Sequence, residues 1–337
     1  MKVKHLKNTM ILIHVDDLNG INYHRLIAPF TRLMETTDLK FYWFGTLEEI
    51  KLYNLEIVSH IIISRKLAIV NYKAFRDMLD KYGVKLILDN DDFWELTSDN
   101  PAYLVYELYM GKRIKETIRI ADEVWCPSKY LAKMTRRVNP KVSIKIIPNG
   151  INPDEAQWNN VQKYSSEELR FGYIGANGHS KDVGLVGYNF SGKEFYCVDL
   201  MDYVELFGAK HKLAPKPVFE YGTLYKNFDV SIAPLGGGRF NKSKSNLKVV
   251  EAAFTKTALI ASNTSPYKES IEHGKTGLLC ANKDEWKEAI ESMTVEYARE
   301  LANNLYESMK DEYHIDTINN LRLQTLYGDN HPNSNKE

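Results

Sequence analysis

The residues best suited to chemistry gather in one stretch, residues 228–262, which reads FDVSIAPLGGGRFNKSKSNLKVVEAAFTKTALIAS. An apolar run that stops at Pro234 predicts a strand. Glycines 236–238 follow it, where the backbone can take positive φ or approach a ligand closely. The cations Arg239 and Lys244 come next. Cations beside exposed backbone amides are what a diphosphate group requires.

A helix is predicted after this glycine-rich turn. Ser243 and Ser245 are placed to cap it. Lys244, Lys248 and Glu251 recur at i, i+4 and i+7, so they share one face, and Glu251 is placed to accept hydrogen bonds from sugar hydroxyls. The alternative interpretation is a solvated basic loop before an ordinary helix; the glycines, the serines and Glu251 together favour the binding site.

A second candidate site lies in the sequence LDNDDFWEL. Asp89, Asp91 and Asp92 lie at the end of a predicted strand, with Trp94 close behind them. Clustered carboxylates can bind a divalent metal or orient sugar hydroxyls, and they can equally cap a following helix. We favour the functional interpretation, because the carboxyl end of a strand in a two-domain fold faces the ligand cleft. Asp91 and Asp92 are therefore candidate catalytic residues, and no metal site is predicted.

The elements that must position these residues alternate between strand and helix. In the first half, apolar runs predict strands at residues 10–15, 41–45, 60–64, 85–91, 123–128 and 145–150. Helical periodicity marks residues 23–35, 74–82 and 103–120. This alternation predicts a doubly wound α/β domain over residues 1–150.

A second α/β domain is predicted over residues 169–326, after a polar linker at 151–168. Its strands are expected at residues 170–175, 193–199, 229–235, 257–262 and 276–280. Two amphipathic helices are expected between residues 285 and 326; the last helix could pack back on the first domain, and residues 327–337 read as a disordered tail. Two such domains predict a ligand cleft between them.

Composition narrows the class of protein. The chain has 337 residues, 44% hydrophobic and 26% charged, which is typical of a soluble globular protein. Its three cysteines, odd in number and far apart, suit a reducing compartment, so a cytoplasmic location is expected. The apolar run at residues 10–15 is too short for a signal peptide. Neither a transmembrane helix nor an amphipathic anchor is evident.

Charge is balanced overall but unevenly spread. The net charge is zero, with +4 on residues 1–165 and −4 on the remainder. The segment from Lys112 to Lys145 holds ten basic and three acidic residues. Such a patch is most often a solvated helix face, and the alternative is a contact surface for nucleic acid or an acidic membrane.

The glycine pattern argues against a dehydrogenase. The first predicted strand leads to a segment with one glycine, and the strand at residues 170–175 leads to glycines at 172, 175 and 178. Neither spacing matches the dinucleotide-binding turn.

Several motifs together resemble the GT-B class of nucleotide-sugar glycosyltransferases, specifically the retaining family 4 (group 1) enzymes. Those of the second half are GYIGANGHSKD, FDVSIAPL, FNKSKSNLKVVEAA and ALIASNTSPYKESIEHGKTGLL. Those of the first half, individually less specific, include GINYHRLIAPFTRL, LDNDDFWEL, ADEVWCPSKYLAKM and IIPNGI. The resemblance implies two Rossmann-like domains that face each other across a cleft.

The resemblance also implies roles for individual residues. Arg239 and Lys244 would neutralise the leaving diphosphate, and Glu251 would accept from the nucleotide ribose. Other donor-binding residues would be Gly175, His179, Ser245, Asn246, Lys248 and Asn149. An acceptor-side loop would present Asn19, Gly20, Tyr23, His24 and Arg25. His24 and His179 have an equally good interpretation as structural histidines.

One position departs from the family pattern. Many members carry a second glutamate eight positions before the ribose-binding one, where this chain has Ser243. Recognition of the donor sugar must therefore differ, and the FNKSKS loop is expected to replace that contact.

The implied activity is transfer of a hexosyl or pentosyl group from a UDP- or GDP-linked donor to a hydroxyl acceptor, with retention of configuration. No tightly bound cofactor is expected. The acceptor is a glycan or, because of the basic segment, a hydroxymethylated base of viral DNA. The remaining alternatives are a non-catalytic sugar-nucleotide-binding protein and a GT-B epimerase.

Overall fold

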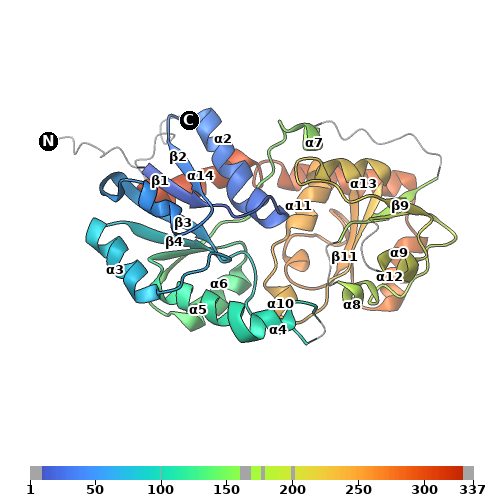
Figure 1. The fold of residues 1–337 in the computed structure, drawn as a ribbon. Coiled ribbons are helices and arrows are strands. Elements are labelled where there is room, and N and C mark those ends of the chain that lie inside the picture. The colour runs from blue at the N-terminus through green and yellow to red at the C-terminus, as the bar shows by residue number, and fades with distance from the viewer. Residues whose placement is uncertain (1–9, 99, 160–167, 176–178, 199–201, 329–337) are drawn as a thin grey trace. The chain divides into compact units, whose positions relative to one another are not determined.

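The computed structural model describes residues 10–98, 100–159, 168–175, 179–198 and 202–328 of the chain. They form two compact units (Figure 1). The first contains residues up to 149 together with those from Ile318 onward, and the second contains residues 150–317.

The first unit is built on a six-stranded parallel sheet in the order β2-β1-β3-β4-β5-β6. Its strands are β1 (Met10–His14), β2 (Phe41–Phe44), β3 (Val58–Ser64), β4 (Lys85–Asp89), β5 (Glu123–Cys126) and β6 (Ser143–Ile146). Five of the six strands predicted for this half are confirmed, and the sixth, predicted at residues 145–150, overlaps β6 only at residues 145 and 146 because the strand lies earlier in the chain.

The helices of the first unit follow these strands. They are α1 (Gly20–Asn22), the π-helix η1 (Tyr23–Ile27), α2 (Ala28–Thr36), the 3-10 helices η2 (Glu49–Leu52) and η3 (Leu55–Ile57), α3 (Tyr72–Tyr82), α4 (Tyr103–Val105), the π-helix η4 (Tyr106–Met110), α5 (Gly111–Ile120) and α6 (Lys129–Val138). The helix predicted at residues 103–120 is thus interrupted by a π turn, which periodicity alone does not reveal.

The second unit contains a parallel sheet in the order β12-β11-β10-β7-β8-β9. Its strands are β7 (Arg170–Tyr173), β8 (Glu194–Val198), β9 (His211–Leu213), β10 (Val230–Ala233), β11 (Ala258–Ser262) and β12 (Leu278–Cys280). Its helices are α7 (Ala156–Asn159), α8 (Ser180–Val183), α9 (Tyr203–Phe207), the 3-10 helix η5 (Tyr221–Asn227), α10 (Arg239–Lys242), α11 (Leu247–Phe254), the 3-10 helix η6 (Tyr267–Glu269), α12 (Lys283–Glu291) and α13 (Val295–Met309). Only β9, short and polar, was not predicted.

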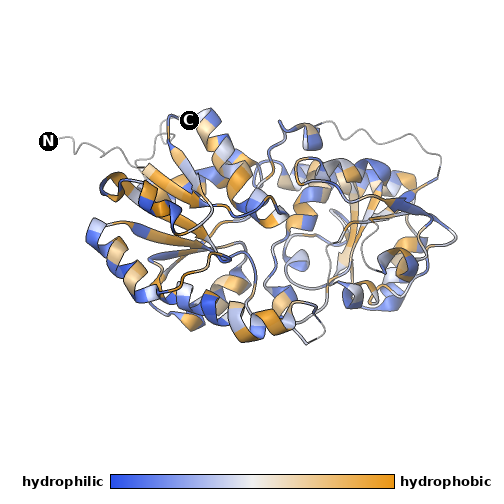
Figure 2. Cartoon of the chain, in the orientation of Figure 1, coloured by the Kyte–Doolittle hydropathy of each residue, from blue (hydrophilic) through white to orange (hydrophobic). Residues whose placement is uncertain are grey.

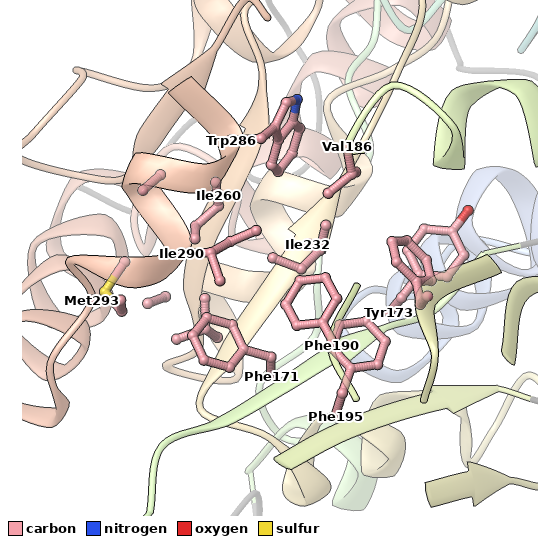
Figure 3. Packing of buried hydrophobic residues seen from close by; sticks show 14 of the residues in the cluster. Phe171, Tyr173, Val186, Phe190, Phe195, Ile232, Ile260, Trp286, Ile290 and Met293 are labelled. Atoms are coloured by element: carbon pink, nitrogen blue, oxygen red, sulfur yellow. The ribbon is translucent and has the colours of Figure 1, made fainter. Parts of the chain in front are cut away.

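Hydrophobic residues are concentrated in the strands of both sheets, whereas the helices mix hydrophobic and hydrophilic residues (Figure 2). This is the pattern of a sheet covered on both faces. In the second unit, aromatic and aliphatic side chains pack together in the core (Figure 3). The rings of Phe190 and Phe195 lie 4.1 Å apart, and that of Phe171 lies 5.7 Å from Phe190. A Cβ atom on Gly172 would lie 2.1 Å from the ring of Phe228, so close packing requires glycine there.

The C-terminal helices differ from the prediction of two. Helix α13 ends at Met309, and α14 (Ile315–Tyr327) is a third helix. The chain turns between them because the carbonyl of Ile151 accepts a hydrogen bond from the amide of Ile315, and the amide of Ile151 donates to Tyr313. Periodicity could not show this break, since its cause is a segment far away in the sequence.

The predicted linker at residues 151–168 is packed at its start. Ile151 and Trp158 lie in a hydrophobic cluster of the second unit, and the side chain of Gln157 accepts a hydrogen bond from the amide of Gly222 at 3.0 Å. Residues 160–167 and the predicted tail from residue 329 lie outside the described residues. Helix α14 packs Ile318, Leu323 and Leu326 into the core of the first unit.

The buried His60 of β3 makes stability depend on pH. Burial, aided by the charge of Lys85, lowers the pKa of His60 to about 4. In the folded protein His60 therefore stays neutral at a pH at which it is protonated in the unfolded chain, where its pKa is about 6.5. We expect the free energy of unfolding to be greatest above pH 6.5 and to fall towards pH 4, by about 2 kcal/mol at pH 5.

Urea unfolding at pH 7 and pH 5 measures this loss. His60→Gln should reduce it, whereas the same change at the exposed His273 should not. An equal loss in the wild type and His60→Gln would contradict the assignment.

Candidate functional site

The glycine-rich turn follows β10, as predicted, but its glycines serve a different purpose. None of the described residues 236–238 has positive φ. Space is tight at Gly236, because a Cβ atom there would lie 3.0 Å from Oδ1 of Asp182. Gly237 and Gly238 are exposed, and a Cβ atom on either would meet nothing within 4 Å. The expected positive φ is therefore wrong, and the group that Gly236 approaches in this structure is the side chain of Asp182. Close approach to a ligand stays a prediction.

Asp182, a buried residue of α8, holds this turn in place. Its Oδ1 accepts hydrogen bonds from the amide of Gly236 at 2.8 Å and from Nδ2 of Asn241 at 3.0 Å. Its Oδ2 lies 2.6 Å from Nδ1 of His179. One carboxylate thus joins the donor-side turn at His179, the glycine-rich turn and helix α10.

The basic loop is organised by α10 rather than by serine caps on α11. Ser243 is the C-cap of α10, is fully buried, and donates its hydroxyl to the carbonyl of Arg239 at 2.8 Å. The N-cap of α11 is Asn246, whose side chain makes no capping hydrogen bond. The predicted capping by Ser243 and Ser245 is therefore wrong, because the chain completes one short helix before it starts the next.

Arg239 and Lys244 both belong to this loop. Arg239 is exposed on α10. Lys244 precedes α11, so it does not share a helix face with Lys248 as predicted; its Nζ lies 4.4 Å from the centre of the Phe240 ring. A cation over an aromatic face is stabilised at this distance. The two cations thus lie on one short loop after the glycine-rich turn.

Lys248 and Glu251 form an ion pair on α11. Nζ of Lys248 lies 2.9 Å from Oε2 of Glu251, and it also donates to the hydroxyl of Tyr221. The same Oε2 accepts from the hydroxyl of Tyr225 at 2.8 Å. Glu251 is only 2% exposed, so its charge is compensated inside the unit. Lys248 is therefore committed to Glu251.

The tyrosines around this pair remain protonated near neutral pH. Burial and then the charge of Glu251 raise the pKa of Tyr221 to about 12 and that of Tyr225 well above its ordinary value. The positive charge of Lys248 partly opposes this effect at Tyr221. Burial disfavours the charged form of Lys248 itself, but the charge of Glu251 outweighs it and raises the Lys248 pKa. The pair and its two tyrosines therefore carry no net charge.

The other predicted donor-side residues are placed around these groups. Asn246 is buried, and its Nδ2 donates to the hydroxyls of Ser270 and Tyr313, both at 2.9 Å. A Cβ atom on Gly175 would lie 2.2 Å from the hydroxyl oxygen of Tyr173, so this glycine is needed for packing. Residues 176–178 of the predicted turn lie outside the described residues.

In the first unit, the predicted acceptor-side loop is mostly helical. Asn19 accepts a hydrogen bond from the amide of Asn22 and begins α1, so Gly20 is already helical. Tyr23, His24 and Arg25 lie in the π-helix η1 and are buried. The expectation of a loop through Arg25 is therefore wrong, because the Asn19 cap starts the helix earlier than periodicity indicated.

Arg25 forms the centre of a buried polar group. Its Nε lies 2.9 Å from Oδ1 of Asp89, and its Nη1 donates to Oδ1 of Asn149 at 3.1 Å. Burial raises the pKa of Asp89 although Arg25 opposes this effect. Burial and the charge of Arg25 lower the pKa of Arg322 to about 9. Arg25, Asp89 and Asn149 are thus brought together, at the end of β4 and after β6.

Asp91 and Asp92 have different surroundings. Oδ1 of Asp91 accepts from Nε of the buried Arg65 at 2.6 Å, and Nη1 of Arg65 donates to the hydroxyl of Tyr106 at 2.9 Å. Oδ1 of Asp92 accepts from the amide of Phe93. Among the described residues, no group of three or more His, Cys, Asp and Glu side chains could hold a metal ion.

Asp182, Tyr221, Tyr225 and Arg65 were not singled out from the sequence. Asp182 lies three residues after His179, a spacing at which helical side chains meet. Tyr221 and Tyr225 are four residues apart. These spacings are local signals, but their partners Gly236, Glu251 and Asp91 become visible only in the fold.

Known proteins share this architecture. Residues 193–295 match the family model described as glycosyl transferases group 1. That segment includes the glycine-rich turn, the basic loop and Glu251. No curated protein sequence matches the chain at a significant level.

Solved structures resemble both units together. HepE from Anabaena in complex with UDP is 13% identical, with 94% of this chain and 99% of that chain covered and a TM-score of 0.63. Sucrose-phosphate synthase from Thermosynechococcus elongatus is 13% identical, with coverage of 95% and 98% and a TM-score of 0.66. A glycosyltransferase from Rickettsia africae is 14% identical, with coverage of 94% and 97% and a TM-score of 0.61.

At these identities the structural likeness concerns the fold, which is GT-B: two Rossmann-like units, each with a six-stranded parallel sheet. The resemblance to group 1 glycosyltransferases that the sequence motifs predicted is confirmed on residues 193–295 by the family match, and the predicted GT-B fold is confirmed by the solved structures.

Proposed function

We propose that the chain is a glycosyltransferase that moves a sugar from a UDP-linked donor to a hydroxyl acceptor, with retention of configuration. The observation that carries the proposal is the coincidence of the group 1 family match with the glycine-rich turn, the basic loop and the Lys248–Glu251 pair. HepE, of the same fold, is known in complexes with UDP and with UDP-glucose, which supports the choice of nucleotide.

The chemistry needs stabilisation of charge more than an activated nucleophile. In transfer, the bond between the anomeric carbon and the diphosphate oxygen breaks, and the acceptor oxygen bonds to that carbon. The proton of the acceptor hydroxyl passes to the departing phosphate. Negative charge therefore develops on the diphosphate, where Arg239, Lys244 and backbone amides after Gly236 would stabilise it.

Lys248 has a different role in this proposal. Its charge is neutralised by Glu251 at 2.9 Å, so it supports the carboxylate and contributes little to the diphosphate. Glu251, oriented by Lys248 and Tyr225, would accept hydrogen bonds from the ribose hydroxyls. The donor would thus be held at two places, the diphosphate by the loop and the nucleoside by α11.

A direct test is titration with UDP, UDP-glucose, GDP and GDP-mannose, followed by measurement of nucleotide release with and without hydroxyl acceptors. Binding of a UDP-sugar and release that requires an acceptor are expected. A protein that binds the nucleotide but never transfers would be a non-catalytic relative, and failure to bind any nucleotide would refute the proposal.

The first prediction from this proposal concerns the two loop cations. Arg239→Ala and Lys244→Ala should each lower kcat by about a hundred- to a thousandfold, the usual effect of losing one charge-stabilising contact. Lys242→Ala is the matched control, because Lys242 is also an exposed cation of α10 and should be dispensable. Activity assays and thermal unfolding on all three variants distinguish catalysis from folding. Normal turnover in both site variants would remove the diphosphate assignment.

The second prediction concerns Glu251. Glu251→Gln should weaken donor binding more than it slows transfer, because a ribose contact is similar in the ground state and the transition state. Tyr225→Phe removes one hydrogen bond to the same oxygen but keeps the carboxylate, so a smaller loss of donor affinity is expected. Unchanged donor affinity with a collapsed kcat in Glu251→Gln would mean that the carboxylate acts at the sugar instead.

The third prediction concerns Asp182 as a positioning residue. Asp182→Ala should weaken donor binding about ten- to a hundredfold, since the turn at Gly236 loses its anchor. Asp182→Asn keeps an oxygen for Gly236 and Asn241 and should restore most of the affinity. Calorimetric titration with UDP checks both. Wild-type affinity in Asp182→Ala would show that the turn holds its shape without this carboxylate.

A further inference from the structure

The helical segment formed by α4 and η4, residues 103–110, exposes large apolar side chains. Leu104 is 66% exposed, Val105 53%, Leu108 54% and Tyr109 64%. No other six-residue stretch among the described residues has more than two exposed large hydrophobic side chains. Scattered exposed apolar residues are ordinary, but a cluster of them on a folded protein marks an interaction surface.

The segment is fixed to the first unit, so its apolar residues cannot simply turn inward. The hydroxyl of Tyr106 accepts a hydrogen bond from the buried Arg65. A Cβ atom on Gly111 would lie 2.7 Å from the carbonyl oxygen of Trp94, so the helix backbone packs directly against the chain that follows β4. The π turn adds a residue and rotates residues 103–110 relative to α5, whose Ile114 and Ile118 are fully buried.

Basic residues follow the apolar cluster, on the helix that continues it and on the helix packed against that one. Helix α5 packs against α6, and exposed basic side chains line the two helices. They are Lys112, Arg119, Lys129, Lys133, Arg136 and Arg137. Exposed acidic side chains between residues 103 and 138 are fewer: Glu107, Glu116, which pairs with Arg119, and Asp122, which pairs with Arg76.

We propose that this face, namely residues 103–110 with the basic residues of α5 and α6, binds the surface of an anionic lipid bilayer. Apolar side chains beside lysines and arginines are suited to the boundary between acyl chains and anionic headgroups. Tyr109 adds an amphipathic ring of the kind enriched at that boundary. No described helix is long and apolar enough to cross a membrane, so the contact is with one surface.

The apolar and basic residues together favour an anionic bilayer over other binding partners. A nucleic acid would engage the cations but would leave the apolar cluster in water. A second copy of the chain would bring like charges of α5 and α6 together. Arg136 moreover has fewer hydrogen-bond donors left for a phosphate, because its Nη1 already donates to the carbonyls of Pro140 and Val142. The bilayer alone matches both the apolar and the basic part.

The inference does not rest on the proposed glycosyltransferase activity, since binding to lipid is measured without donor. The experiment is co-sedimentation of the full chain with vesicles of phosphatidylcholine and of an equal mixture of phosphatidylcholine and phosphatidylglycerol. Binding to the mixed vesicles that weakens with salt is expected. Leu104→Glu with Leu108→Glu should lower the partition coefficient about tenfold or more.

A matched control is Leu52→Glu with Val70→Glu, which makes the same change at isolated exposed positions, 83% and 95% exposed. This control should bind like the wild type. Lys112→Glu with Lys133→Glu should lose affinity for the anionic vesicles and with it most of the salt dependence. All variants change exposed side chains, and thermal unfolding verifies that they remain folded.

The proposal is overturned if the wild type does not bind anionic vesicles at low salt, or if the control variant loses as much affinity as the apolar variant. It is also overturned if the apolar variant leaves vesicle binding intact and instead abolishes a concentration-dependent dimer, duplex-DNA binding, or affinity for UDP. Each of these results would assign the cluster to another occupant. Failure of the chain to bind any nucleotide would not affect this test.

Discussion

Every strand pair in the part of the chain that the structure describes is parallel, and this constraint decides which residues can meet in a site. In a parallel sheet all strands end at one edge, so residues that follow different strands meet there. In the first unit, Asp89 ends β4 and meets Asn149, which follows β6, through the guanidinium of Arg25. In the second unit, Asp182 follows β7 and meets Gly236, which follows β10. Long stretches of sequence separate these partners, and only the common strand direction brings them together.

Each unit also contains a buried carboxylate paired with a cation, and the two pairs have different surroundings. In the second unit the cation and the carboxylate are one helical turn apart, on α11, and two tyrosines surround them. In the first unit Asp89 pairs with Arg25, while burial and the charge of Arg25 lower the pKa of the nearby Arg322 and the charge of Asp89 only partly opposes this effect. Burying a charge is costly unless it is paired, so both arrangements constrain the backbone around them.

The fold was largely predictable, because buried parallel strands are continuous apolar runs bounded by polar residues. Strand β9, His211–Leu213, lacks such a run, and its place at the edge of the sheet follows from pairing with β8. The π turns η1 and η4 were not predictable either. A π turn places one extra residue in a turn of an otherwise ordinary helix, and no particular residue type marks where it occurs.

The candidate site was predictable in composition but not in geometry. The glycines, Arg239, Lys244 and Glu251 were identified from type and spacing, and all belong to the same unit. The sequence could not reveal that a separate short helix, α10, ends at Lys242. Lys244 therefore precedes α11 and does not share a helix face with Lys248. Such details depend on tertiary partners, and a spacing rule that assumes one continuous helix cannot include them.

Because α14 packs on the first unit, it also determines the order in which the two hydrophobic cores can be completed during synthesis. The core around Phe30 and Trp125 is closed by Ile318, Leu323 and Leu326, residues that leave the ribosome after the whole second unit. The second unit, residues 150–317, can therefore complete its own core before the first can. Although the first unit begins the chain, its nascent core lacks Ile318, Leu323 and Leu326 until α14 is made, and the carbonyl of Arg25 lacks the hydrogen bond that Arg322 donates.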